Sequence, residues 1–272
     1  MKFGLIGHPI AHSLSPALFK AGYDGRYPYE LIETADFEEA YARFLEGYDG
    51  INVTAPFKEL AYAKADIRSE ECSLAKAANL LVKTSEGVKA YNSDLLGVRL
   101  WLQECTDGVD TKNNCNQEMT ALIVGTGGAG RAAAAAAVTL GLKVILMNRN
   151  IERAEKLAGD LMSMGYGEEV RALEDFRACF READIIIYNI PTRIPELDTL
   201  TDSDFATGRP KFTLEANYKD PSFDENLIKR MTQANPLARH SGGRTWLLYQ
   251  ALTGYEIFTG ERPDLQRMSD VL

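Results

Sequence analysis

Short apolar runs alternate with helix-like segments through the first hundred residues. Strands are predicted at residues 2–7, 29–33, 50–54, 80–84 and 88–92. Segments from Pro16, over 36–45, after Pro56 and from Ser93 have the periodicity of helices. The alternation of these two patterns predicts an α/β domain.

The second half of the chain continues the alternation after a polar interruption. This interruption, residues 104–118, has no apolar periodicity and is expected to be a linker or loop that closes the first domain. Further helices are expected at 151–164, near Phe176 and over 241–260, and strands around Val170, at 183–190 and at 211–218. The run at 183–190 is continuously apolar, which is typical of a central parallel strand.

Residues 121–150 carry the most specific pattern: an apolar strand, a glycine turn, an alanine-rich helix and a second strand. Gly125, Gly127 and Gly130 form a complete G-x-G-x-x-G between strand and helix. The first glycine permits the tight turn, the second lets the backbone approach a pyrophosphate, and the third lets helix and strand pack closely. The phosphates would then lie at the helix N-terminus. The pattern predicts a Rossmann-type dinucleotide-binding domain.

The end of the second strand indicates which dinucleotide is bound. NAD-binding domains commonly place an acidic residue there to hold the ribose 2′-hydroxyl. Here Asn148 and Arg149 follow the strand at 143–147, and Arg153 comes one helical turn later. A guanidinium can donate two hydrogen bonds to a 2′-phosphate, so NADP is favoured over NAD. The alternative is that both arginines only lie on an exposed helix start.

Composition narrows the class of protein. A chain of 272 residues with 45% hydrophobic and 25% charged residues suggests an ordinary globular protein of two domains. The net charge of −9 argues against a nucleic acid or a membrane surface as partner, and no apolar run reaches the ~20 residues of a membrane helix. Four scattered cysteines and a strand-like start predict reduced thiols in the cytoplasm. We therefore expect a small molecule as partner.

Two serines precede the first helix in GHPIAHSLSP. The hydroxyls of Ser13 and Ser15 could bind a carboxylate at the exposed N–H groups of that helix. The alternative is structural, because Ser15 followed by Pro16 is a common N-cap and first-turn pair.

A lysine and an aspartate are candidates for acid/base chemistry. Lys58 follows the strand in GINVTAPFKE, and partial burial there would favour its neutral form, although a nearby carboxylate would oppose this. Asp94 in AYNSD is the candidate carboxylate, with helix capping or dipole stabilisation as the alternative. Asn79 is either a turn former or a donor to a substrate. The three histidines have no ligand spacing, so no metal is expected.

These motifs, in this order, resemble those of the shikimate dehydrogenase family over essentially the whole chain. GHPIAHSLSP resembles the family's amino-terminal substrate loop, INVTAPFKE its catalytic-lysine motif, and AYNSD its Asn-Thr-Asp motif, with Ser93 in place of threonine. GTGGAGR and NRN resemble the NADP motifs, with Asn150 where threonine is usual. GGRTWLLYQA resembles the segment that closes the site.

The resemblance implies reversible, NADPH-dependent reduction of 3-dehydroshikimate to shikimate. Lys58 and Asp94 would be the catalytic pair, and Ser13 and Ser15 would hold the substrate carboxylate. The other implied substrate-binding residues are Thr54, Asn79, Asn92, Tyr218 and Gln250. The implied cofactor-binding residues are Gly125, Thr126, Gly127, Gly128, Ala129, Gly130, Asn148, Arg149, Arg153, Gly243 and Trp246.

We therefore predict two α/β domains. Residues 1–103 and 243–272 would form the substrate-binding domain, to which the C-terminal helix returns, and residues 104–242 the NADP-binding Rossmann domain. Oligomeric state is left open between monomer and homodimer.

The chain departs from the family pattern around the expected nicotinamide. It has YNIPTRIPELD in place of an Asn-Ala-Thr loop that ends in Gly-Met, LEANYKDPSF in place of a Tyr-Asn-Pro run, and Trp246 in place of methionine. These changes concern the exact substrate more than the reaction type. One alternative is therefore a dehydrogenase for quinate or another cyclic polyol acid. The other is a nucleotide-binding regulator without turnover, against which retention of Lys58 and Asp94 argues.

Overall fold

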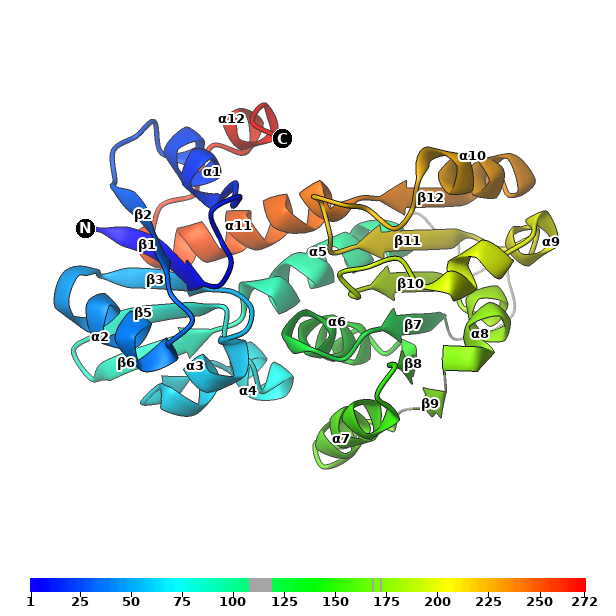
Figure 1. The fold of residues 1–272 in the computed structure, drawn as a ribbon, viewed down its shortest axis with the longest axis horizontal. Helices are drawn as coiled ribbons and strands as arrows, with labels where there is room; N and C mark the ends of the chain where they lie inside the picture. Colours follow the sequence, from blue (N-terminus) through cyan, green and yellow to red (C-terminus); the bar gives the residue numbers. More distant parts are fainter. Residues whose placement is uncertain (108–118, 168, 172) are drawn as a thin grey trace. The chain divides into compact units, whose positions relative to one another are not determined.

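The computed structural model describes residues 1–107, 119–167, 169–171 and 173–272 (Figure 1). The chain divides into two compact units: unit 1 is Met1–Gly97 with Leu248–Leu272, and unit 2 is Val98–Leu247. Both boundaries fall within helices, α5 (Ser93–Asp107) and α11 (Gly243–Thr259). Within the described ranges, no helix combines the length and apolar character needed to cross a membrane.

Unit 1 contains a six-stranded mixed sheet in the order β2-β1-β3-β5-β6-β4. The first three strands are parallel, whereas β5 pairs in antiparallel fashion with both β3 and β6. Its strands are β1 (Phe3–Gly7), β2 (Tyr29–Glu33), β3 (Gly50–Val53), β4 (Ile67–Arg68), β5 (Leu80–Thr84) and β6 (Gly87–Tyr91). Its further helices are α1 (Ser15–Gly22), α2 (Phe37–Gly47), α3 (Lys58–Lys64), α4 (Glu70–Ala75) and α12 (Leu265–Ser269).

The C-terminal part of α11 belongs to the core of unit 1. Phe258 stacks on Phe3 with ring centroids 4.8 Å apart, and Tyr255 meets Phe19 edge-on at 4.8 Å. The Tyr255 hydroxyl also donates to the Ser15 carbonyl at 3.1 Å. The last 25 residues therefore pack against the first helix of the chain.

Unit 2 contains a six-stranded parallel sheet in the order β12-β11-β10-β7-β8-β9. The chain starts at β7, builds outward through β8 and β9, and returns to the other side of β7 for β10, β11 and β12, which confirms the predicted fold class. Its strands are β7 (Thr120–Val124), β8 (Lys143–Met147), β9 (Glu169–Arg171), β10 (Ile185–Tyr188), β11 (Lys211–Glu215) and β12 (Ala238–Ser241). Its helices are α6 (Gly128–Thr139), α7 (Ile151–Met162), α8 (Phe176–Glu182), α9 (Asp202–Phe205), α10 (Glu225–Ala234) and the 3-10 segments η1 (Leu173–Asp175) and η2 (Pro195–Thr199).

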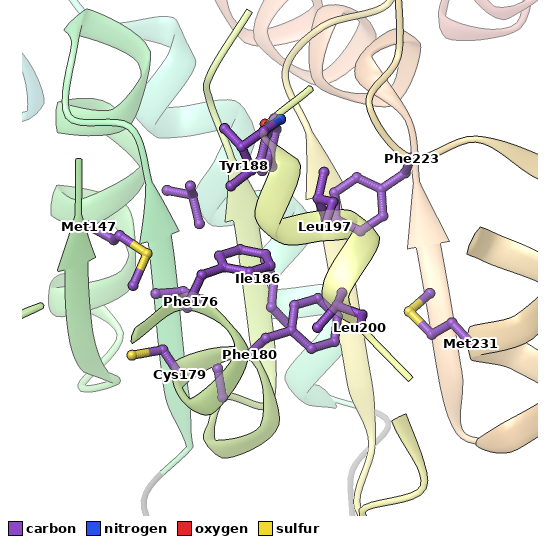
Figure 2. Close-up of a cluster of buried hydrophobic side chains, with 14 of the residues drawn as sticks. Met147, Phe176, Cys179, Phe180, Ile186, Tyr188, Leu197, Leu200, Phe223 and Met231 are labelled. Carbon is purple, nitrogen blue, oxygen red and sulfur yellow. The ribbon is translucent and has the colours of Figure 1, made fainter. Parts of the chain in front are cut away.

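A continuous apolar cluster lies on one face of this sheet (Figure 2). Ile186 of β10 and Met147 of β8 contribute from the strands, and Phe176 and Phe180 contribute from α8. Leu197 of η2 is also buried in it, so the segment that follows β10 is anchored by apolar contacts.

The described residues match most of the predicted elements and differ at some ends. Residues 104–107, predicted as linker, continue α5, and residues 108–118 lie outside the described residues. The strand predicted over 211–218 ends at Glu215, because the Asn217 side chain closes a turn by accepting from the Lys219 and Asp220 N–H groups at 3.0 and 3.3 Å. Sequence analysis did not predict β4, α4, η2, α9, β12 or α12.

Candidate functional site

Lys58 and Asp94 form a hydrogen-bonded ion pair in unit 1. Lys58 is the first residue of α3 and Asp94 is the second residue of α5. The lysine Nζ donates to the aspartate Oδ2 at 2.6 Å, and the two side chains are only 15% and 5% exposed. An ammonium and a carboxylate with so little solvent around them attract each other more strongly than a surface pair does.

Asn92 rather than Asp94 caps α5. Its side-chain oxygen accepts from the Leu95 N–H at 2.9 Å, and its amide donates to the Ala77 carbonyl at 2.6 Å. The capping alternative for Asp94 is therefore wrong, although Asp94 does lie in the first turn of the helix. Asn92 is completely buried, and its role toward a substrate stays a prediction.

Ser93 joins two of the predicted substrate-binding residues. Its hydroxyl accepts from the Asn79 amide at 2.9 Å and donates to the Gln250 side-chain oxygen at 3.4 Å. Its backbone N–H donates to the Asn79 side-chain oxygen at 2.7 Å. These bonds set the orientation of both amide groups, so the residue that replaces the usual threonine is an internal connector with no exposed surface.

The serine pair lies at the start of α1 but does not cap it. The Ser13 hydroxyl donates to the Ser15 hydroxyl at 3.1 Å and accepts from the Ser15 N–H at 3.2 Å. Leu14 occupies the N-cap position, and no side chain caps the helix. The capping alternative for Ser15 is therefore wrong. The two hydroxyls lie together, as a carboxylate-binding role requires.

Sequence analysis missed two polar residues next to this pair. The Tyr29 hydroxyl donates to the Asn52 side-chain oxygen at 2.8 Å, and Asn52 donates to the Asn79 carbonyl at 3.4 Å. Burial raises the pKa of Tyr29 well above its usual value. An asparagine inside the buried strand GINV is the signal that could have identified this position.

Thr54 and Lys58 are presented by the segment after β3. The Thr54 methyl packs against the end of β1, where a β-carbon at Gly7 would lie 2.4 Å from it. The Thr54 N–H donates to the Ile6 carbonyl at 2.9 Å, which ties the segment to β1. The threonine is therefore held next to the carboxyl end of β1, from which the serine loop departs.

The glycine turn of unit 2 has the geometry that the motif predicts. Gly125 has a φ of +93°, which favours glycine, and a β-carbon on Gly130 would lie 1.9 Å from the Gly125 carbonyl oxygen. Gly127 is the N-cap of α6 and has no atom within 4 Å of where its β-carbon would be. No side chain caps this helix, so the backbone at Gly128 and Ala129 is open to an anion.

The end of β8 carries no acidic residue. The Asn148 amide donates to the Thr126 hydroxyl at 2.8 Å, which links this strand end to the glycine turn. Arg149 and Arg153 are exposed. Arg149 precedes the N-cap residue Asn150, so the predicted one-turn relation on a helix face is wrong, because only Arg153 is helical.

Gly243 and Trp246 lie at the start of α11, in unit 2. A β-carbon on Gly243 would lie 2.5 to 2.7 Å from backbone atoms of Asn217 and Tyr218, so the glycine allows the helix to approach the loop after β11. Trp246 is 7% exposed. The roles of Tyr218, Gly243 and Trp246 toward ligands stay predictions.

His240 is one of the three histidines considered as metal ligands, and it is paired within unit 2. Its Nδ1 is 2.8 Å from the Thr213 hydroxyl, its ring stacks on Phe223, and burial lowers its pKa to about 4. The described residues contain no group of three or more His, Cys, Asp or Glu side chains that could hold a metal ion.

Comparison with known proteins identifies the family. Residues 5–81 match the shikimate dehydrogenase substrate-binding domain, and residues 109–201 match the shikimate/quinate 5-dehydrogenase domain. A protein of Acinetobacter baumannii named shikimate dehydrogenase (NADP(+)) is 31% identical over 97% of this chain and 98% of its own length. The chain belongs to the shikimate dehydrogenase family. The resemblance inferred from the motifs is thereby confirmed.

Further members of the shikimate dehydrogenase family agree in sequence and structure. A protein of Haloarcula marismortui with the same name is 32% identical over 98% of this chain and 96% of its own length. The crystal structure of Mycobacterium tuberculosis shikimate dehydrogenase superposes with a TM-score of 0.77 at 28% identity, over 99% of this chain and 97% of that one. The Thermus thermophilus enzyme in complex with NADP(H) and shikimate superposes with a TM-score of 0.76 at 26% identity, over 100% and 98%.

Proposed function

We propose that this chain catalyses the reversible NADPH-dependent reduction of 3-dehydroshikimate to shikimate, a step toward chorismate and the aromatic amino acids. The observation that carries the proposal is the nearly buried Lys58–Asp94 pair, with Nζ and Oδ2 2.6 Å apart. A regulator that only bound a nucleotide would have no need of such a pair. The names of the family relatives, shikimate dehydrogenase (NADP(+)), support both the substrate and the cofactor.

Lys58 is the proton donor in the reducing direction. When bound, NADPH supplies a hydride to the ring carbonyl carbon. The carbonyl π electrons move to oxygen, and this oxygen takes a proton from the Lys58 ammonium, which leaves an alcohol and a neutral amine. Asp94 holds the ammonium in place through the 2.6 Å hydrogen bond. The amine then regains a proton from solvent, and the reverse reaction retraces these steps.

Unit 1 supplies the contacts to the substrate. Ser13 and Ser15 bind the carboxylate, since their hydroxyls already lie within 3.1 Å of each other. Asn79 and Gln250 bind ring hydroxyls, and Ser93 presents both amides in one orientation. Thr54 and Asn92 of unit 1 belong to the same proposed substrate set, as does Tyr218 of unit 2.

Unit 2 fits NADP(H). The open space at Gly127 and the uncapped N-terminus of α6 suit the pyrophosphate. The absence of Asp and Glu from positions 148–150, with Arg149 exposed beside the strand end, suits a 2′-phosphate rather than a free 2′-hydroxyl. Residues 104–242 would be the cofactor domain and the remaining residues the substrate domain. We further propose that the enzyme acts in the cytoplasm on small molecules, as a monomer or homodimer.

The test measures reduced-nicotinamide absorbance with shikimate or quinate and NADP⁺ or NAD⁺, in all four combinations. Turnover with shikimate and NADP⁺ is expected. If the enzyme turns over quinate but not shikimate, quinate replaces shikimate as the proposed substrate. A wild-type enzyme that is inactive in all four combinations would refute the proposed function.

Two lysine variants then test the chemistry. Lys58→Met should lower kcat by about 10²- to 10⁴-fold while NADPH binding is retained. Lys64→Met is the matched control, since Lys64 lies on the same helix and pairs with Glu38 at 2.6 Å, but on the exposed surface. Equal activity of the two variants would remove the proposed role of Lys58.

A further inference from the structure

The segment after β10, residues 189–194, is held in place by hydrogen bonds, ion pairs and apolar contacts; we name it the β10 loop. It lies within the YNIPTRIPELD sequence, residues 188–198, that departs from the family pattern. Its residues Pro191, Thr192 and Arg193 are exposed, yet two of its backbone carbonyls accept hydrogen bonds, one from Tyr188 at the end of β10 and one from Asn217 after β11.

The β10 loop lies where the nicotinamide end of a dinucleotide is expected. β10 and β8 flank β7 on opposite sides, so the sheet reverses its direction of growth between β7 and β10. A dinucleotide lies across the carboxyl ends of the strands at such a switch point. Because Arg149 at the end of β8 suits the 2′-phosphate, the opposite end of the cofactor extends toward β10. The loop also touches the glycine turn, since a β-carbon on Gly125 would lie 3.2 Å from Asn189 and Ile190 atoms.

Tyr188 and the apolar cluster of unit 2 contact the β10 loop on its buried side. The Tyr188 hydroxyl donates to the Thr192 carbonyl at 2.7 Å and accepts from the Ile194 N–H at 3.2 Å. Ile194 and Leu197 are buried in the cluster, and Figure 2 shows Leu197 beside Phe223 from the loop after β11. Buried apolar side chains therefore anchor the end of the β10 loop and the segment that follows it.

Asn217 and Arg193 connect the β10 loop to neighbouring segments by hydrogen bonds and ion pairs. The Asn217 amide donates to the Pro191 carbonyl at 2.9 Å and to the Asp220 carbonyl at 2.7 Å. Arg193 donates to the Ser222 carbonyl and pairs with Asp198 at 2.7 Å and with Asp224 at 3.2 Å. The bonds to Asn217, Ser222 and Asp224 join the β10 loop to the loop after β11, residues 216–224, whereas Asp198 belongs to η2.

We propose that Asn217 and Arg193 are positioning residues that hold the β10 loop as a fixed wall against the nicotinamide. The chain thereby replaces the family's glycine-containing loop with a cross-braced one. This inference rests on the NADP(H) binding proposed above. It predicts that loosening the brace weakens contacts to the nicotinamide half of the cofactor and leaves the adenosine 2′-phosphate half unaffected.

The experiment compares two ligands on matched variants of the full chain. NADPH carries the nicotinamide, whereas 2′,5′-ADP carries only the adenosine and the 2′-phosphate. Asn217→Asp keeps the acceptor for the Lys219 and Asp220 N–H groups but removes both donations. Asn235→Asp is the matched control, because its amide likewise donates to two carbonyls, those of Phe205 and Arg209, before the amino end of β12. Both variants add the same charge.

Asn217→Asp should raise the Kd for NADPH about fivefold, the size expected if the loosened loop loses one hydrogen bond to the nicotinamide half, and that for 2′,5′-ADP less than twofold. Asn235→Asp should leave the ratio of the two Kd values as in the wild type. Arg193→Met provides a second, independent test, and it should raise the ratio of the Kd for NADPH to the Kd for 2′,5′-ADP as Asn217→Asp does. Arg193→Lys should bring this ratio part of the way back to the wild-type value. Equal effects on both ligands, or none, would overturn the inference. A wild type that binds neither ligand would instead refute the proposed cofactor, and with it this inference.

Discussion

Adding a methyl group should lower the stability of the protein at Gly130 and the affinity for NADPH at Gly127, although both glycines belong to one motif. In Gly130→Ala the new β-carbon would lie 1.9 Å from the Gly125 carbonyl oxygen and 2.8 Å from its carbon. Ordinary C···O contacts are about 3.3 Å or longer, so α6 and the turn after β7 must separate by about 1.4 Å. Both sides of this contact are backbone, and no rotamer change can relieve it.

The expected cost follows from this geometry. Replacing glycine by alanine inside a helix gains about 1 kcal/mol from propensity, whereas overpacking a closely packed site costs about 1–3 kcal/mol and sometimes more. Because the clash here joins two backbones next to the fully buried strand β7, we expect a cost above that range, about 4 kcal/mol or more, which leaves a net loss of at least about 3 kcal/mol. For a protein of this size that loss lowers Tm by about 6 to 12 °C.

Gly127→Ala is the matched variant. Nothing lies within 4 Å of its β-carbon position, and its φ of −75° and ψ of −168° are accessible to alanine. The free energy of unfolding should therefore change by less than about 1 kcal/mol. The methyl group would occupy the space that the pyrophosphate must approach, so the Kd for NADPH should rise at least about tenfold.

Thermal unfolding and NADPH fluorescence titration of both variants distinguish the two effects. A Tm of Gly130→Ala equal to that of the wild type would contradict the predicted clash. A wild-type Kd for NADPH in Gly127→Ala would contradict the predicted approach of the pyrophosphate.

Three further predictions follow from the described contacts. Arg149→Ala should weaken NADPH by about 2 kcal/mol and NADH far less, and equal losses in titrations with both would remove the case for a 2′-phosphate contact. Ser93→Ala should raise KM for shikimate about fivefold through the loss of its bonds to Asn79 and Gln250, with KM for NADPH unchanged; steady-state kinetics that show no change in the shikimate KM would contradict this. Because the pKa of His240 is lowered to about 4, the stability it contributes is present above its unfolded pKa of about 6.5 and is lost as pH falls toward 4. Urea unfolding of the wild type should therefore lose about 2 kcal/mol more between pH 7 and pH 5 than His240→Gln does, and parallel curves would show that the histidine is not buried in its neutral form.

Local sequence rules predicted the structure correctly where all the residues that determine it lie within a few consecutive positions. Gly125, Gly127 and Gly130 act within six residues, and steric requirements on consecutive residues are visible in the sequence. The same kind of rule was wrong for Ser15, because Leu14 adopts helical angles and takes the N-cap position. It was also wrong for the one-turn relation between Arg149 and Arg153, because Arg149 precedes the N-cap Asn150 and only Arg153 is helical.

Motif resemblance indicated which residues carry the chemistry, but it could not indicate how they are connected. Lys58 and Asp94 are 36 positions apart, and they meet because α3 and α5 follow strands of one sheet. Ser93 joins Asn79 to Gln250, and no local pattern reveals the importance of this serine.

The sequence by itself determined the alternation of strands and helices, the glycine turn, the acidic-residue-free end of β8 and the family. These depend on short-range sterics, apolar periodicity and residue identity, which are written along the chain. Tertiary structure alone decided the Tyr29–Asn52 contact and the brace formed by Asn217 and Arg193. Such contacts depend on strand order and on loops from different strands that end at the same edge of a sheet, and a linear pattern does not contain those distances.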